Sequence, residues 1–377
     1  MNKTNQIFFL SASLLFMGCS SVNNKGKETD GTKQDSLVFV AGSYSPQNEE
    51  GIKIFTFSQD DAGYAYKSGI TGIPNPSFLS ELTAGNIIYS VAEGGDGDSY
   101  IYALKYSPDS MTLAMAGHDR TLGSAPCFVM ADAKRGVAFT ANYSGGSLTV
   151  FGADGSGNVA RRKVLNFRGR GVHPSRQEKP HIHSVYYSPD STRLWACDLG
   201  TDRIRVIRAD DYTYTGEEDI VLPEGSGPRH MCFHPDGKRA YVITELSGDV
   251  VVMDTEDGRT AEIIQTAKAD TVGGEGSADI HLSPDGRFLY ASCRLKADGL
   301  AVFRVSAETG KIERTGYCPT GKHPRNFAIT PNGRYILVAC RDENAIEIYS
   351  VDKDTGMPVD TGKRILTKAP VCVRWIK

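Results

Sequence analysis

Two histidines, His181 and His183, stand one residue apart in the stretch "KPHIHSVYYSPDSTRLW". In a β-strand, residues i and i+2 face the same side, so both imidazoles could meet one ligand. Imidazole groups transfer protons near neutral pH and bind metal ions. Which of these roles the pair has depends on the side chains that the fold brings beside it.

A turn that follows the histidine pair recurs along the chain. Proline sets φ for the first turn position, and glycine accepts a positive φ where it is present. An aromatic-rich run follows each copy. The copies are "SPDSTRLW" (188–195), "HPDGKRAY" (234–241), "SPDGRFLY" (283–290) and "TPNGRYIL" (330–337), with weaker copies at 132–139 and 82–89.

The repeat predicts an all-β fold, a seven-bladed β-propeller with four-stranded blades over residues 36–377. Units of nearly 50 residues with alternating apolar runs are typical of propeller blades. The last unit has room for one strand only, "PVCVRWI" at 370–376, whereas spare strands lie near residue 40. We therefore expect the C-terminal strand to pair with the N-terminal strands and close the ring.

Polar residues fall at two fixed offsets within the repeat. The first ring, six residues before each turn proline or its equivalent, begins the strand that lines the channel. The second ring, ten residues after it, ends the neighbouring antiparallel strand, so both rings should lie at one channel mouth. The first ring is Ser77, Cys127, His183, Arg229, Ala278, Arg325 and Val371; the second is Glu93, Tyr143, Leu199, Glu245, Arg294 and Arg341.

These rings predict a site for an anion at the channel mouth. Guanidinium groups match carboxylate and phosphate geometry, and a histidine or glutamate among them could move a proton. A solvated ring of paired charges is the alternative. The candidate catalytic residues are Glu245, His183 and His181; the candidate substrate-binding residues are Arg229, Arg294, Arg325, Arg341, His230 and Asn142.

A metal site is disfavoured, although Asp198 or Glu245 could add a third ligand to the histidine pair, because neighbouring arginines repel a cation. No cofactor is expected. His323 lies in a loop and is expected at the surface, uninvolved. Six cysteines inside apolar runs, among them Cys127 and Cys372, are expected to be small buried hydrophobes, not disulfides. The net charge of −3 gives no reason to expect nucleic acid as a partner.

The N-terminus predicts export. "MNKTNQIFFLSASLLFMGCSS" has an early lysine and an apolar run too short to span a bilayer. It ends in Gly18-Cys19, which resembles a bacterial lipobox; an ordinary signal peptide with a chance cysteine is the alternative. The predicted division is a signal peptide at 1–18, a lipidated Cys19 with a polar tether at 19–35, and the propeller. We therefore expect the protein to be a cell-envelope lipoprotein, on the periplasmic side or anchored in the outer membrane, that contacts the membrane only through its lipid.

From about residue 37 onward the chain resembles the lactonase family of seven-bladed β-propellers, the 6-phosphogluconolactonase type, whose fold a muconate-lactonizing cyclase shares. The resemblance rests on several motifs in the right order. They include "NPSF" (75–78), "ANYSGGSLTVF" (141–151), "SRQEKPHIHSVYYSPD" (175–190), "GSGPRHMCFHPDGKRAYVITEL" (225–246), "IHLSPDGRFLYASCR" (280–294) and "HPRNFAITPNGRYILVACRD" (323–342).

The resemblance implies metal-independent hydrolysis, or formation, of a sugar-acid or dicarboxylate lactone. The family's histidine, two arginines and glutamate match the His181/His183 pair, Arg229, Arg294 and Glu245. A phosphorylated lactone is cytoplasmic, which conflicts with export, so an unphosphorylated aldonolactone is also open. The rival function is a propeller that binds a glycan, sugar acid or protein without catalysis. Nothing in the sequence argues for an oligomer, and a monomer is expected.

Overall fold

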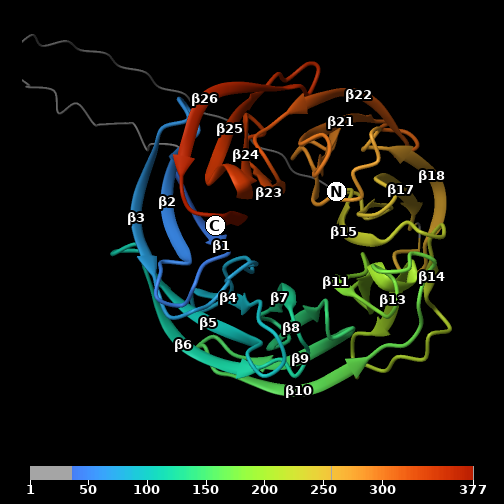
Figure 1. Ribbon diagram of the computed structural model, residues 1–377, viewed down its shortest axis with the longest axis horizontal. Helices are drawn as coiled ribbons and strands as arrows, with labels where there is room; N and C mark the ends of the chain where they lie inside the picture. Colours follow the sequence, from blue (N-terminus) through green and yellow to red (C-terminus); the bar gives the residue numbers. More distant parts are fainter. Residues whose placement is uncertain (1–35, 256, 377) are drawn as a thin grey trace, which may run out of the picture. The chain divides into compact units, whose positions relative to one another are not determined.

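Short apolar runs of alternating polarity become strands of seven antiparallel sheets arranged in a ring (Figure 1). The computed structural model describes residues 36–255 and 257–376. The ring confirms the predicted all-β seven-bladed propeller, and among these residues the only helices are two single-turn 3₁₀ helices, η1 (Leu199–Thr201) and η2 (Arg341–Glu343).

We number the blades I to VII along the chain. From the channel outward, blade I is β27 (Pro370–Ile376), β1 (Ser36–Ser43), β2 (Ile52–Ser58) and β3 (Tyr64–Ile70). Blade II is β4 (Ile87–Ala92), β5 (Tyr100–Ser107) and β6 (Thr112–Arg120). Blade III is β7 (Pro126–Asp132), β8 (Val137–Asn142), β9 (Ser147–Ala153) and β10 (Val159–Asn166).

The remaining four blades each have four strands. Blade IV is β11 (Ile182–Tyr187), β12 (Arg193–Asp198), β13 (Arg203–Arg208) and β14 (Ile220–Val221). Blade V is β15 (Pro228–Phe233), β16 (Arg239–Thr244), β17 (Asp249–Asp254) and β18 (Glu262–Lys268). Blade VI is β19 (Ile280–Leu282), β20 (Phe288–Cys293), β21 (Gly299–Val305) and β22 (Ile312–Pro319), and blade VII is β23 (Pro324–Ile329), β24 (Tyr335–Cys340), β25 (Ala345–Val351) and β26 (Pro358–Leu366).

Blade I closes the ring as predicted, with the C-terminal β27 paired to the N-terminal β1. The pairing is antiparallel and joins Phe39 to Trp375. The Trp375 ring meets Phe39 edge to face at 5.5 Å, and its indole N–H donates to the Ile329 carbonyl of blade VII at 2.8 Å. The first and last strands therefore share one sheet and also lock against the preceding blade.

Blade II departs from the four-stranded pattern. The segment in the inner-strand position forms isolated bridges only, between Leu79 and Ser90 and between Thr83 and Ile87. Pro76 does not account for this, since the equivalent residues Pro126, Pro228, Pro324 and Pro370 begin intact inner strands. The chain still lies where an inner strand would, so Ser77 keeps its place in the first ring.

The repeated turns have the predicted geometry. Gly237, Gly286 and Gly333 have φ of 71–72°, a region open to glycine. In each turn the amide of this residue donates to the carbonyl three residues earlier, at 2.8–2.9 Å. Ser191 occupies the same place in blade IV with φ of 58°. The repeat therefore tolerates one strained serine where its other strong copies have glycine.

The cysteines within the described residues are all free, as expected, and all but Cys232 are buried. The predicted signal peptide, the lipidated Cys19 and the tether lie outside the described residues. None of the helices in the described part of the chain is long and apolar enough to cross a membrane.

Candidate active site

The inner strands deliver the first ring to one end of the channel. Cys127, His183, Arg229 and Arg325 are each the second residue of their strand, in β7, β11, β15 and β23. The Cys127 sulfur lies 3.7 Å from His183 Nδ1. Burial, followed by the charges of Arg229, His230 and Arg325, holds the pKa of His183 well below its usual value. The predicted first ring therefore converges, and His183 is neutral at physiological pH.

Glu245, directly after β16, is clamped by three guanidinium groups. Its Oε2 lies 2.8 Å from Arg229 Nε and 3.5 Å from Arg294 Nη2, and its Oε1 lies 2.5 Å from Arg176 Nη2. Burial opposes ionisation of this carboxyl, but Arg294, Arg229 and Arg176 outweigh it and hold the pKa at about 2. Glu245 is thus a permanent carboxylate that fixes the arginines and is a weak base.

Arg294 is held from its other side by a histidine. Its Nε donates to the Gly276 carbonyl at 2.5 Å, and its Nη1 lies 3.0 Å from His323 Nε2. His323 is 7% exposed, and its Nδ1 lies 3.5 Å from Asp342. Burial and then the nearby arginines lower the pKa of His323 to about 3. The expectation of an uninvolved surface histidine is wrong: neutral His323 is a hydrogen-bond acceptor that orients Arg294.

Arg325 is the open guanidinium of the site. Its central carbon lies 5.3 Å from the ring centre of Tyr44, whose hydroxyl donates to the Glu93 carboxylate at 3.0 Å. Within residues 36–255 and 257–376, no hydrogen bond or ion pair engages its N–H donors. The Ser77 hydroxyl, in the same ring, is buried and also without a partner in this part of the chain. These donors are available to a ligand in the channel.

The histidine pair is ordered by Tyr143, the second-ring residue of blade III. The His181 ring stacks on the Tyr143 ring at 4.5 Å, and the His183 ring meets it edge to face at 5.6 Å. His181 Nδ1 lies 3.0 Å from the Tyr143 carbonyl, which can only accept, so this nitrogen carries a proton. Nε2 of the same ring lies 3.2 Å from the carboxylate of Glu178, a half-exposed side chain.

Three predicted binding residues are placed differently. Asn142 is fully buried inside blade III, where its amide donates to Ser147 and Thr149. Arg341 pairs with its neighbour Asp342 in η2, with 2.6 Å between Nε and Oδ1. His230 lies further along the channel, where its Nδ1 contacts Asp279 at 2.7 Å. The structure does not bring these three side chains together with the Glu245 clamp, except where His230 Nε2 lies 3.4 Å from Arg229 Nη1.

Arg176 and Tyr44 are site residues that the repeat register missed. Arg176 lies in the long connection between β10 and β11, and it also donates to the Tyr143 hydroxyl at 3.2 Å. Tyr44 follows β1, in the blade built from both chain ends. Neither belongs to a ring position, so only the three-dimensional contacts identify them.

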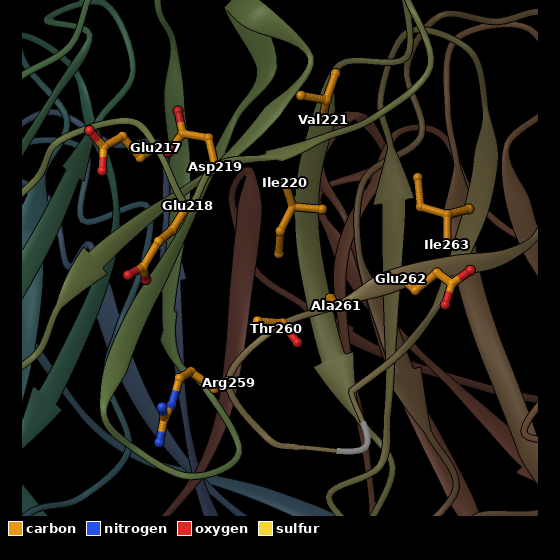
Figure 2. Close-up of a pocket in the computed structure, with 10 residues that line it drawn as sticks. All are labelled: Glu217, Glu218, Asp219, Ile220, Val221, Arg259, Thr260, Ala261, Glu262 and Ile263. Carbon is orange, nitrogen blue, oxygen red and sulfur yellow. The ribbon is translucent and has the colours of Figure 1, made fainter.

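A separate cavity of about 600 Å³ lies at the outer rim, between β14 and β18 (Figure 2). Its lining is rich in carboxylates, including Glu217, Glu218, Asp219 and Glu262. Asp219 is 2.9 Å from Arg205 and Glu218 is 2.6 Å from Arg193, so both are already paired. This rim cavity does not suit an anion. Within the described residues, no group of three His, Cys, Asp or Glu side chains could hold a metal ion.

The fold and the channel-mouth arrangement define a class: a seven-bladed propeller with an arginine-rich channel mouth. A family model described as "Lactonase, 7-bladed beta-propeller" matches residues 38–375. The chain belongs to this lactonase family.

Relatives of known name agree with the family. The 6-phosphogluconolactonase of Bacillus subtilis is 29% identical over 346 residues, 90% of this chain and 98% of that protein. The 6-phosphogluconolactonase of Formosa agariphila is 32% identical over 329 residues, 85% and 93% of the two chains. The periplasmic gluconolactonase of Pseudomonas aeruginosa is 28% identical with a TM-score of 0.84, covering 91% of this chain and 99% of its own.

Proposed function

We propose that this protein hydrolyses a sugar-acid lactone, 6-phosphogluconolactone or a related aldonolactone, to the open acid, without a metal ion. The observation that carries the proposal is the open guanidinium of Arg325, which lies with neutral His183 at the Glu245 clamp. Relatives named as lactonases support the same reaction class. The fold alone would not indicate a reaction class, because propellers have many different functions.

Arg325 is the residue that we expect to bind the anionic group of the substrate. Its five N–H donors meet no acceptor in the described part of the chain, so a ligand carboxylate, phosphate or carbonyl oxyanion would gain charge-assisted hydrogen bonds without breaking any. Arg229 and Arg294 have donors committed to Glu245, Ala278, Gly276 and His323. They therefore add fixed positive charge around the developing oxyanion more than they add free donors.

Proton transfer falls to the histidine pair. Water adds to the lactone carbonyl while a base removes its proton, and the ring C–O bond then breaks as the leaving alkoxide is protonated. His181 is the stronger candidate for the base, because the Tyr143 carbonyl holds its Nδ1–H and so leaves proton exchange to Nε2, which the half-exposed Glu178 side chain has to release first. The lowered pKa of His183 makes it a weak base. We therefore expect His183 to contact the substrate as a neutral side chain and not to remove the proton.

The first experiment measures acid release from 6-phosphogluconolactone and from gluconolactone, above the spontaneous rate. Turnover of either lactone supports the proposal, and the ratio of kcat/KM identifies whether the substrate is phosphorylated. Saturable binding of gluconate or 6-phosphogluconate with no turnover would instead support the rival, a non-catalytic sugar-acid-binding propeller.

The proposal includes action in the cell envelope. The predicted signal peptide and Cys19 support it, as does the periplasmic relative in Pseudomonas aeruginosa. Labelling with a radioactive fatty acid tests the anchor: wild-type protein takes up label and Cys19→Ala does not. An exported but unlabelled wild-type protein would leave an ordinary signal peptide as the explanation.

A further inference from the structure

The channel has a second end, where the inner strands finish. β15 has Arg229 as its second residue, near the candidate active site, and ends at Phe233, and β27 carries Arg374 near its far end. A cavity of about 320 Å³ occupies this second end. Side chains from six blades line it, including Phe78, Phe128, Tyr186, Phe233, His281 and Arg374.

Aromatic rings form a continuous wall of this cavity. The centroids of Phe78 and Phe128 are 4.4 Å apart, those of Phe128 and Tyr186 are 5.3 Å apart, and those of Tyr186 and Phe233 are 6.4 Å apart. Such a wall favours a flat apolar or aromatic body, which gains ring contacts beyond simple area burial.

One unneutralised cation stands over that wall. The central carbon of Arg374 lies 4.6 Å from the ring centre of Phe78, and its Nε donates to the Leu79 carbonyl at 3.2 Å. Its two Nη atoms have no hydrogen bond or ion pair among residues 36–255 and 257–376. Glu81 also lines the cavity but is exposed and forms no ion pair with Arg374 in the described chain. Two adjacent free N–H donors match a carboxylate.

The buried charge of the cavity, that of Asp279, is already satisfied. Asp279 is buried and accepts from His230 at 2.7 Å, from His281 at 2.9 Å and from Asn326 at 2.5 Å. This carboxylate therefore has its charge spread over several donors and opposes an incoming anion less than a free one would.

We propose that this second end of the channel is a binding site for a small aromatic carboxylate, distinct from the lactone site. The aromatic body lies against Phe78, Phe128 and Tyr186, and the carboxylate binds the Nη atoms of Arg374. His230 separates the two sites: it lines this cavity, and its Nε2 lies 3.4 Å from Arg229 of the clamp. A ligand bound in this cavity would contact His230, and His230 in turn contacts Arg229 of the Glu245 clamp. The site does not depend on lactone hydrolysis.

The test is titration of the purified protein with phenylacetate, followed by calorimetry and by NMR of ¹³C-labelled methionine methyl groups. Met130 lines the cavity, whereas Met357 packs in blade VII against Gly316 of blade VI. We expect saturable binding that shifts the Met130 methyl signal and leaves Met357 unmoved. Uncharged 2-phenylethanol should bind at least about tenfold more weakly, because it lacks the charge-assisted hydrogen bonds.

Three variants locate the binding. Arg374→Gln should weaken phenylacetate at least about tenfold. Arg314→Gln is the matched control, because its guanidinium also lies over a ring, that of Tyr317 at 5.5 Å, but on the outer strand β22. Arg325→Gln should leave the affinity unchanged. The proposal is overturned if phenylacetate does not bind, if phenylethanol binds equally, if Arg374→Gln keeps full affinity, or if Arg325→Gln abolishes binding and so places the probe in the lactone site.

Discussion

Arg229 and Glu245 form a buried ion pair, with 2.8 Å between Nε and Oε2, at the point where β15 begins and β16 ends. The repeat register predicted that these two residues share a channel mouth. The contact also changes the role of Glu245, because a carboxylate held by three guanidinium groups at a pKa of about 2 has little affinity for a proton. Its main task is to position the arginines.

Replacing Glu245 should therefore cost stability. Glu245→Gln leaves Arg176, Arg229 and Arg294 without their shared counter-charge, and breaking a buried ion pair from one side typically costs about 3 kcal/mol. We expect the free energy of unfolding in urea to fall by this order. Unchanged stability combined with a loss of kcat would instead make Glu245 the catalytic base.

Substitutions of His181 and His183 should affect different kinetic constants. His181→Gln removes Nε2, the nitrogen proposed to accept the proton, and should lower kcat by about 10²–10⁴-fold with a smaller change in KM. His183→Gln should mainly raise KM, because in the proposed reaction His183 contacts the substrate without transferring the proton. Steady-state kinetics on both variants checks this assignment, and the reverse pattern would exchange the two roles.

Acidification should destabilise the protein through its buried neutral histidines. The pKa values of His230 and His323 are about 3 in the folded protein, below the unfolded value of about 6.5. Between these values the unfolded state holds a proton that the native state lacks, so stability is full above pH 6.5 and falls as the pH drops. His323→Gln should flatten the dependence of the unfolding free energy by about 1.4 kcal/mol per pH unit between pH 6 and 4. An identical slope in wild type and variant would contradict this origin.

A glycine in the turn of blade IV should make the folded protein more stable. Ser191 has φ of 58°, where glycine is free of strain, so Ser191→Gly should stabilise the protein by about 0.5 kcal/mol after the entropy of the unfolded chain is counted. Ser191→Ala keeps the strain and serves as the control. Thermal or urea denaturation would show the gain for glycine alone; equal effects of the two substitutions would rule out the backbone as the cause.

The sequence predicted the ring and much of the site because both follow from one repeat. Register alone grouped His183, Arg229, Glu245, Arg294 and Arg325. Asn142 was misassigned because successive strand residues point to opposite sides, so the neighbour of Tyr143 faces into the blade. His323 was misread although it precedes Arg325 by two residues, just as His181 precedes His183.

Other features were beyond a sequence pattern. Arg176 comes from an irregular connection, and its contact with Glu245 exists only once blades IV and V are side by side. The ionisation of Glu245 and His183 depends on burial and on which charges surround them, and neither quantity can be read from residue spacing. The shortened pairing of the inner segment of blade II became evident only in the structure, because Pro76 has counterparts in Pro126, Pro228 and Pro324, which begin intact strands.

In the proposed reaction, Arg325 binds the anionic part of the lactone that this protein hydrolyses. The most direct measurement is kcat/KM for acid release from 6-phosphogluconolactone and gluconolactone, for wild type, Arg325→Gln and the outer-strand control Arg314→Gln. We expect turnover of at least one lactone by the wild type, a loss of about 100-fold or more in Arg325→Gln, and no change in Arg314→Gln. Absence of turnover by the wild type, or full activity in Arg325→Gln, would contradict the proposed reaction.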